Sequence, residues 1–213
     1  MPRRFDTPLG RLVGAVLSWT VFAFFFVGLY QALGVVLGLG DACATGGPYE
    51  IRVECPDAVA LFAPLGLFGM FLALGIAFAL AGGFGVSLTA WGWPILFVGL
   101  GIQFLLGQGG GQGWVVNIGV GILFLVMGLV PVGYFVSAKA LVPTLVGSRN
   151  LAGERFSFDG RELRYFGLVP TGGSSVAPTG RDWAISLGLW AVSVAAGSWL
   201  AIAAFAALAA SAG

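Results

Sequence analysis

The chain has 213 residues, of which 58% are hydrophobic and only 9% are charged, and its formal net charge is +1. A soluble domain carries about 25% charged residues, so a chain this poor in charge could not cover a water-facing surface. It has no histidine, which excludes His-based acid–base catalysis and the usual zinc and haem sites, and its near-zero net charge gives no reason to expect nucleic acid. The composition predicts an all-α integral membrane protein.

The chain begins with a short basic segment at 1–11, and the first apolar stretch follows at 12–39. A helix needs about 20 apolar residues to cross the hydrocarbon layer of a bilayer, and this stretch is long enough. It is also longer than the core of a cleaved signal peptide, which usually has about 7–15 residues. We therefore expect a permanent first span.

The loop at 40–57 holds both cysteines, Cys43 and Cys55, and four of the nine acidic residues. Two cysteines in an oxidising, extracytoplasmic loop usually pair, and closing a loop of this length is worth about 3 kcal/mol in the chain-entropy model. We expect a disulfide-bonded cap that ties the outer ends of two helices together. A docking surface for an external partner is the alternative, whereas no Cys-x-x-Cys spacing supports a redox role.

Three further spans are expected at 58–81, 86–106 and 114–137. Only the short turn AGGFG separates the second span from the third, so a re-entrant pair over 58–106 is the alternative. The segment GQGGGQG at 107–113 lacks the Lys-Ser/Thr ending and the preceding strand of a phosphate-binding loop, and we interpret it as an outer turn.

The loop at 138–182 is the only sizeable polar segment, and the fifth span is expected after it at 183–210. Its stretch ERFSFDGRELRYF, at 154–166, alternates around Asp159-Gly160, a strong type I′ turn signal. We expect a β-hairpin, which is marginal alone in water, with its aromatic face resting on the membrane interface, the helix ends or a partner. The residues that would share this face are Phe156, Phe158, Leu163 and Tyr165.

Small residues at helical spacing mark the candidate packing faces, because they allow helix backbones to approach closely. The three sets are Gly34 with Gly38, then Gly75, Ala79 and Gly83, and finally Ser193, Gly197, Ala201 and Ala204. They either build the bundle within the chain or bind another subunit, and the alanine-rich fifth span is the first candidate for a protein-facing helix. Gln103 and Asn117 are candidate intramembrane polar contacts, as an interhelical hydrogen bond or as a polar constriction in a pore.

The distribution of arginine predicts the orientation, because cytoplasmic loops of membrane proteins are enriched in basic residues. If 1–11 and 138–182 are cytoplasmic, the inside holds nine of the ten basic residues and the outside holds only Arg52. We therefore expect a five-span bundle in the cell membrane with its N-terminus in the cytoplasm and its C-terminus outside. Nine of the ten basic residues are arginine, and together with the high alanine and glycine content this favours a GC-rich bacterial genome and hence a bacterial cytoplasmic membrane.

By this division all 19 charged residues lie outside the spans, so the usual parts of a proton relay, an intramembrane protease or a metal-dependent enzyme are missing. No catalytic residue, cofactor or metal site is identified. We expect a non-enzymatic subunit or scaffold that packs against other membrane proteins or a second copy of itself, with the lipid bilayer as its other partner. A small channel or facilitator for a neutral or hydrophobic solute is the alternative, and a lipid-acting enzyme using the 138–182 loop is the weakest reading.

Overall fold

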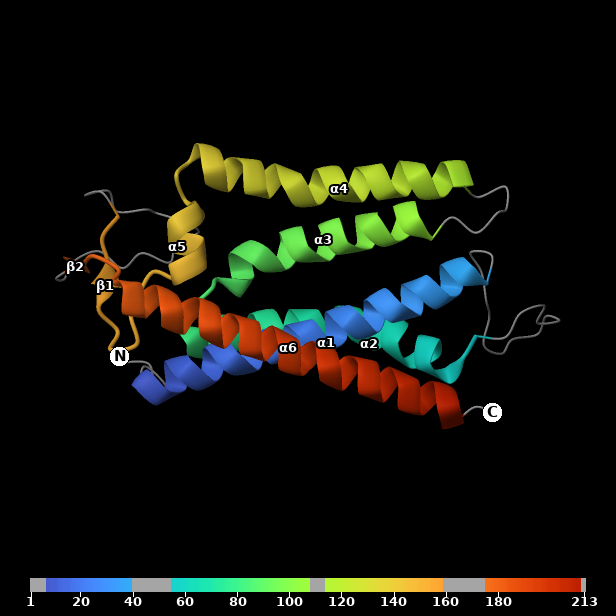
Figure 1. Cartoon of the computed structure of the whole chain (residues 1–213), viewed down its shortest axis with the longest axis horizontal. Helices are drawn as coiled ribbons and strands as arrows, with labels where there is room; N and C mark the ends of the chain where they lie inside the picture. The colour runs from blue at the N-terminus through green and yellow to red at the C-terminus, as the bar shows by residue number, and fades with distance from the viewer. Residues whose placement is uncertain (1–6, 40–54, 108–113, 159–174, 212–213) are drawn as a thin grey trace.

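The computed structural model describes residues 7–39, 55–107, 114–158 and 175–211. Over these residues the chain is mostly helical, and five helices are long and apolar enough to cross a membrane. They run roughly along the long axis of the molecule (Figure 1). These helices are α1 (Pro8–Gly38), α2 (Asp57–Ile76) with its π-helical continuation η1 (Ala77–Ala81), α3 (Leu88–Leu106), α4 (Trp114–Ser137) and α6 (Gly180–Ser211). The prediction of a mostly helical chain with five helices long and apolar enough to span a membrane is therefore confirmed.

Three of these helices begin before the predicted spans, and in α1 and α6 polar residues that hydropathy excludes serve as helix caps. The side chain of Thr7 accepts a hydrogen bond from the Gly10 N–H at 3.0 Å and starts α1. At the start of α6 the Thr179 hydroxyl accepts from the Asp182 N–H at 3.3 Å, and the Asp182 carboxylate accepts in return from the Thr179 N–H at 2.8 Å. Four charged residues that lie outside the predicted spans therefore belong to these helices. These are Arg11, Asp57, Arg181 and Asp182.

The segment considered as a re-entrant pair forms two long helices. The α2–η1 helix has 25 residues and α3 has 19, so each is long enough for a full crossing. The turn between them is short, as the AGGFG sequence predicts, and α3 begins two residues later than expected because 86–87 belong to this turn.

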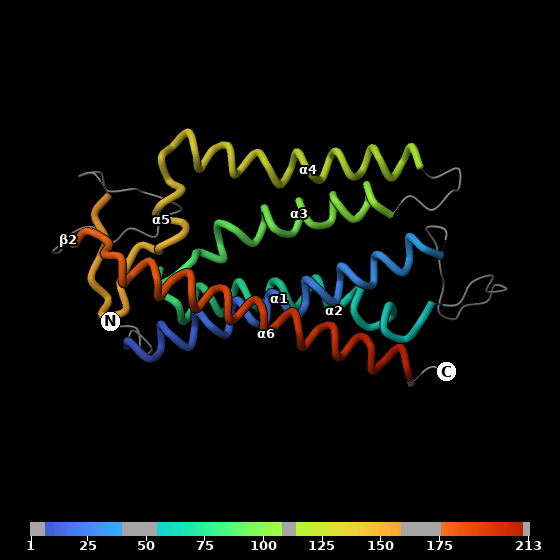
Figure 2. Tube along the Cα trace, in the orientation of Figure 1, coloured from blue at the N-terminus to red at the C-terminus, as the bar shows by residue number. Residues whose placement is uncertain are grey.

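Helix α1 lies at the centre of the bundle. It packs against α2 and α6 along much of its length and more sparsely against α3, whereas the main packing partner of α4 is α3. Figures 1 and 2 show the result, an α3–α4 hairpin beside a group formed by α1, α2 and α6. Helix α4 is accordingly the most peripheral of the five.

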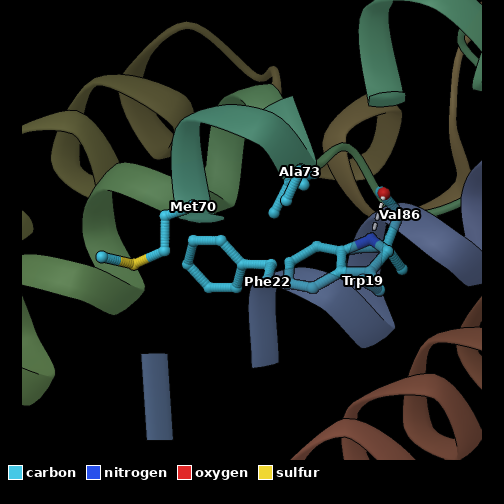
Figure 3. Close-up of a cluster of buried hydrophobic side chains, with 6 residues drawn as sticks. Trp19, Phe22, Met70, Ala73 and Val86 are labelled. Atoms are coloured by element: carbon cyan, nitrogen blue, oxygen red, sulfur yellow. Dashed lines mark hydrogen bonds between the residues drawn. The ribbon is translucent and has the colours of Figure 1, made fainter. Parts of the chain in front are cut away.

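The main buried cluster forms where α1 meets α2 and the turn before α3. Figure 3 shows Trp19 and Phe22 of α1 against Met70 and Ala73 of α2. The Trp19 indole Nε1–H donates to the Val86 carbonyl at 2.8 Å, so the polar edge of this buried ring is satisfied by the turn. Since lipid is as apolar as these side chains, close packing and this hydrogen bond stabilise the cluster more than hydrophobic burial does.

A short helix and two short strands cover the end of the bundle where α4 ends and α6 begins. Helix α5 (Leu141–Val146) runs across from the end of α4 and packs against α6 (Figure 1). Strand β1 (Arg155–Phe156) pairs in parallel with β2 (Ser175–Val176). This parallel pair was not predicted.

The predicted hairpin and disulfide both involve residues outside the described ranges. Asp159-Gly160 and the second arm of the hairpin are among them, so the hairpin stays a prediction. Within the described part, the Phe156 and Phe158 rings lie 6.2 Å apart, as expected for side chains on one face. Cys55 precedes α2, but Cys43 is not among the described residues, so their pairing also stays a prediction.

Candidate functional site: helix-packing faces and a loop junction

The predicted small-residue face of α6 packs against α1. Ser193 is 2% exposed and Ala201 is fully buried. A Cβ on Gly197 would meet the Thr20 carbonyl oxygen and would lie 2.9 Å from the Ala23 Cβ, so only glycine fits at this crossing. One turn beyond Ala201, Ala204 packs against a buried cluster of α1 and α2 side chains. This face of α6 is therefore used within the chain.

The other two predicted stripes do not form continuous contacts. A Cβ on Gly34 would meet the Gln103 side chain, so these two candidate residues come together between α1 and α3. A Cβ on Gly38 or Gly75 would meet nothing within 4 Å, and Ala79 is exposed.

Two further candidate residues are Gly83, which lies in a turn, and Asn117, which is buried on α4. Gly83 has a φ of +88° and lies in the turn before α3 rather than on a helix face. Asn117 is buried near the start of α4, with 5% of its surface exposed.

The α3–α4 contact rests on glycines that are not among the predicted packing residues, most of which are spaced four residues apart. A Cβ on Gly101 would lie 2.9 Å from the Gly121 carbonyl oxygen, and a Cβ on Gly128 would lie 2.8 Å from the Val98 nitrogen. Gly121 and Gly128 are seven residues apart, which returns a residue to nearly the same side of a helix after two turns. A search for seven-residue spacing would have found them.

A second line of residues at seven-residue spacing runs along the opposite side of α4. Gly119 and Gly133 flank Val126 at seven-residue steps. Gly119 and Val126 lie two residues before Gly121 and Gly128, which is about 200° around the helix. A Cβ on Gly119 or Gly133 would meet nothing within 4 Å, and Val126 is 53% exposed. Helix α4 thus carries two such faces, one packed on α3 and one that points away from the bundle.

Hydrogen bonds tie the turn before α3 to α5 and to the residue Ser148 after it, and tie α5 in turn to α6. The Gly83 carbonyl accepts from the Ser148 N–H at 2.8 Å, and the Ser87 N–H donates to the Thr144 carbonyl at 2.9 Å. The Ser186 hydroxyl of α6 donates to the carbonyl of Leu145 at 2.8 Å. Irregular backbone is tolerated in a membrane protein where the protein itself satisfies its polar groups, and these bonds meet that requirement.

Arg11 completes this junction and is the most buried charged residue among those described, with 3% of its surface exposed. Its Nε and Nη2 donate to the Leu151 carbonyl at 3.1 and 2.9 Å. Gly153 has a φ of +95°, and a Cβ there would lie 2.9 Å from Nη2, so glycine leaves room for the guanidinium. The sequence marked Arg11 only as one of the basic residues that set the orientation.

The five apolar helices and their largely lipid-compatible surfaces define a multi-pass helical membrane protein. The chain matches no protein-family model, no curated protein and no solved structure. Its function has to be inferred from its own faces and contacts.

Proposed function

We propose that this chain is a non-enzymatic subunit of a membrane complex, and that the outer face of α4 packs against a transmembrane helix of another membrane protein. In this proposal the N-terminus and the loop at 138–182 lie in the cytoplasm. The loop at 40–57, with a Cys43–Cys55 disulfide, caps the outer side. The observation that carries the proposal is the line formed by Gly119, Val126 and Gly133, which places two glycines with open space beside them on the outer face of α4.

The physical argument rests on how helices associate in lipid. A leucine or valine gains little by leaving lipid for another helix, so association depends on close van der Waals packing and on weak Cα–H contacts between backbones. Glycine permits that close approach, whereas a purely lipid-facing surface has no need of it. The Gly101–Gly121 crossing is an example of such an approach within this chain.

The position of Gln103 also supports a role in helix packing, in preference to a role in lining a pore. It was the candidate for a polar constriction, but its amide lies against Gly34 between α1 and α3. A polar side chain in this position serves as an interhelical contact. No observation of comparable weight favours a solute pathway.

The test is co-purification from native membranes in mild detergent, with a double variant, Gly119→Leu with Gly133→Leu, that fills the outer face of α4. The matched control is Gly75→Leu, because Gly75 is likewise exposed with nothing within 4 Å of its Cβ position, but on α2. We expect the wild-type chain and the control to retain a stoichiometric partner and the double variant to lose it, with unchanged thermal unfolding in all three. A wild-type chain that purifies alone, or a double variant that keeps its partner, would contradict the proposal.

A cysteine at position 126 distinguishes the two kinds of partner. Val126→Cys lies at the centre of the outer face, so oxidation would link two copies of this chain if the partner were a second copy. We expect no such dimer, because the proposal places a different membrane protein on this face.

A further inference from the structure

The turn that ends α4 has a lysine where helix ends normally have glycine. The Lys139 N–H donates to the Val136 carbonyl at 3.1 Å, and the Ala140 N–H donates to the Phe135 carbonyl at 2.8 Å. These two bonds form a Schellman motif, in which the residue at position 139 adopts the left-handed conformation. Lys139 has a φ of +54° and is the only non-glycine residue with positive φ in the described ranges.

Folding alone would favour glycine at this position, because a Cβ clashes with the backbone in the left-handed region. The turn cannot relax easily, since Phe135 is 2% exposed and Ala140 is 1% exposed on either side of it. The chain contains 36 glycines but only one lysine, which stands at a site that disfavours it. A residue held in such a conformation points to a function for its side chain.

The surroundings of Lys139 suggest which chemistry this function involves. The exposed apolar surface of α4 ends here, with Tyr134 56% exposed and Val136 59% exposed just before the turn. The lysine is exposed, and its ammonium group has no hydrogen-bond or ion-pair partner among the residues that the structure describes. An ammonium at the edge of a lipid-facing surface lies at the depth of the phospholipid headgroups.

The charge of this end of the molecule is complementary to an anionic lipid. All the described basic residues belong to this end, and they are Arg11, Lys139, Arg149, Arg155 and Arg181. The described acids of the same end serve local bonds, Glu154 with Asn150 and Asp182 with Thr179. We propose that Lys139 binds the phosphate of an anionic phospholipid at the end of α4.

The test measures lipid binding to the detergent-solubilised full chain by native mass spectrometry, with phosphatidylglycerol as the anionic probe and phosphatidylcholine as the neutral one. Lys139→Gln removes the charge and keeps the strained backbone, whereas Lys139→Gly removes both. We expect both variants to bind the first phosphatidylglycerol about fivefold more weakly, with phosphatidylcholine binding unchanged. Lys139→Arg should restore the affinity.

Thermal unfolding separates lipid binding from a structural role. If the ammonium merely capped the last carbonyls of α4, Lys139→Gly would lose that contact and unfold at a lower temperature. We expect the opposite, a higher melting temperature for Lys139→Gly in lipid-free detergent, because glycine relieves the backbone. A lower value would overturn the proposal.

Two further arms test specificity. Arg181→Gln removes another exposed cation from the same end. If this variant lost as much affinity for phosphatidylglycerol as Lys139→Gln does, the lipid would be attracted by the overall charge of this end and not bound at a site formed by Lys139. Inorganic phosphate at millimolar concentration should not displace the lipid. Displacement would identify a soluble anion as the ligand and overturn the assignment to lipid.

Discussion

Arg11 is a buried cation whose side chain joins two distant segments of a chain that has few charged residues. Its guanidinium is buried and donates two hydrogen bonds to a carbonyl 140 residues away, at Leu151. Burying a cation is costly, and charge-assisted hydrogen bonds offset that cost. The loop at 147–156 is therefore held against the start of α1.

We predict that Arg11→Met loosens this loop. The substitution keeps the aliphatic packing but leaves the Leu151 carbonyl without this donor, which should lower the free energy of unfolding by roughly 2 kcal/mol. Hydrogen–deuterium exchange should rise at the amides of Gly153 and Glu154, which are bonded within the loop. The control is Arg181→Gln, a change at an exposed cation, and equal exchange in both variants would show that Arg11 does not hold the loop.

At the residue scale, the sequence indicated which kinds of residue pack helices together better than it indicated which individual residues lie at a contact. It identified small residues as packing elements, and Gly34, Gly197 and Ala201 do lie at close contacts. It could not separate them from Gly38 and Gly75, because open space on one side of a glycine depends on which helices pack where. The burial of Arg11 was equally hidden, since its acceptor comes from a distant loop.

At the scale of elements, hydropathy placed the helices well and their ends less well. The bounds of α4 are those predicted, and the starts of α1 and α6 differ because Thr7 and Thr179 with Asp182 cap them. Capping is a local polar signal that a search for apolar length discards. The parallel pairing of 155–156 with 175–176 is a contact between separate segments, which no local alternation could predict.

The seam between α1 and α6 gives a prediction for element packing. Gly197→Ala would push a methyl group into the Thr20 carbonyl and to 2.9 Å from the Ala23 Cβ. We expect the free energy of unfolding in detergent to fall by about 1–3 kcal/mol, because overpacking forces the two helices apart. Gly188→Ala on the same helix is the matched control, since its Cβ would meet nothing within 4 Å. Equal melting temperatures for the two variants would show that the α1–α6 contact accommodates the added methyl group without loss of stability.

At the scale of the whole molecule, one helix organises the bundle and one end concentrates its polar contacts. Helix α1 packs against α2, α6 and α3, so α4 reaches the rest of the bundle mainly through α3. The loop junction and the described basic residues all lie at the end where α1 begins and α4 ends (Figure 1). The sequence predicted this polarity from the distribution of arginine, but not the hydrogen bonds that fix it, because these join turns far apart in the chain.

This polarity leads to a prediction about orientation. Five spans place the start of α1 and the end of α6 on opposite sides of the membrane. Because basic residues favour the cytoplasmic side, and all five described basic residues belong to the end with the loop junction, that end should face the cytoplasm. Fusions after residue 213 and within the loop at 159–174 test this with a reporter that is active only outside the cell and a fluorescent protein that folds only inside it. We expect the outside reporter to be active after residue 213 and the fluorescent protein to be bright in the loop.

The reverse pattern would mean that arginine does not set the orientation. It would also place the cysteine-containing loop at 40–57 in a reducing compartment, where its predicted disulfide would not persist.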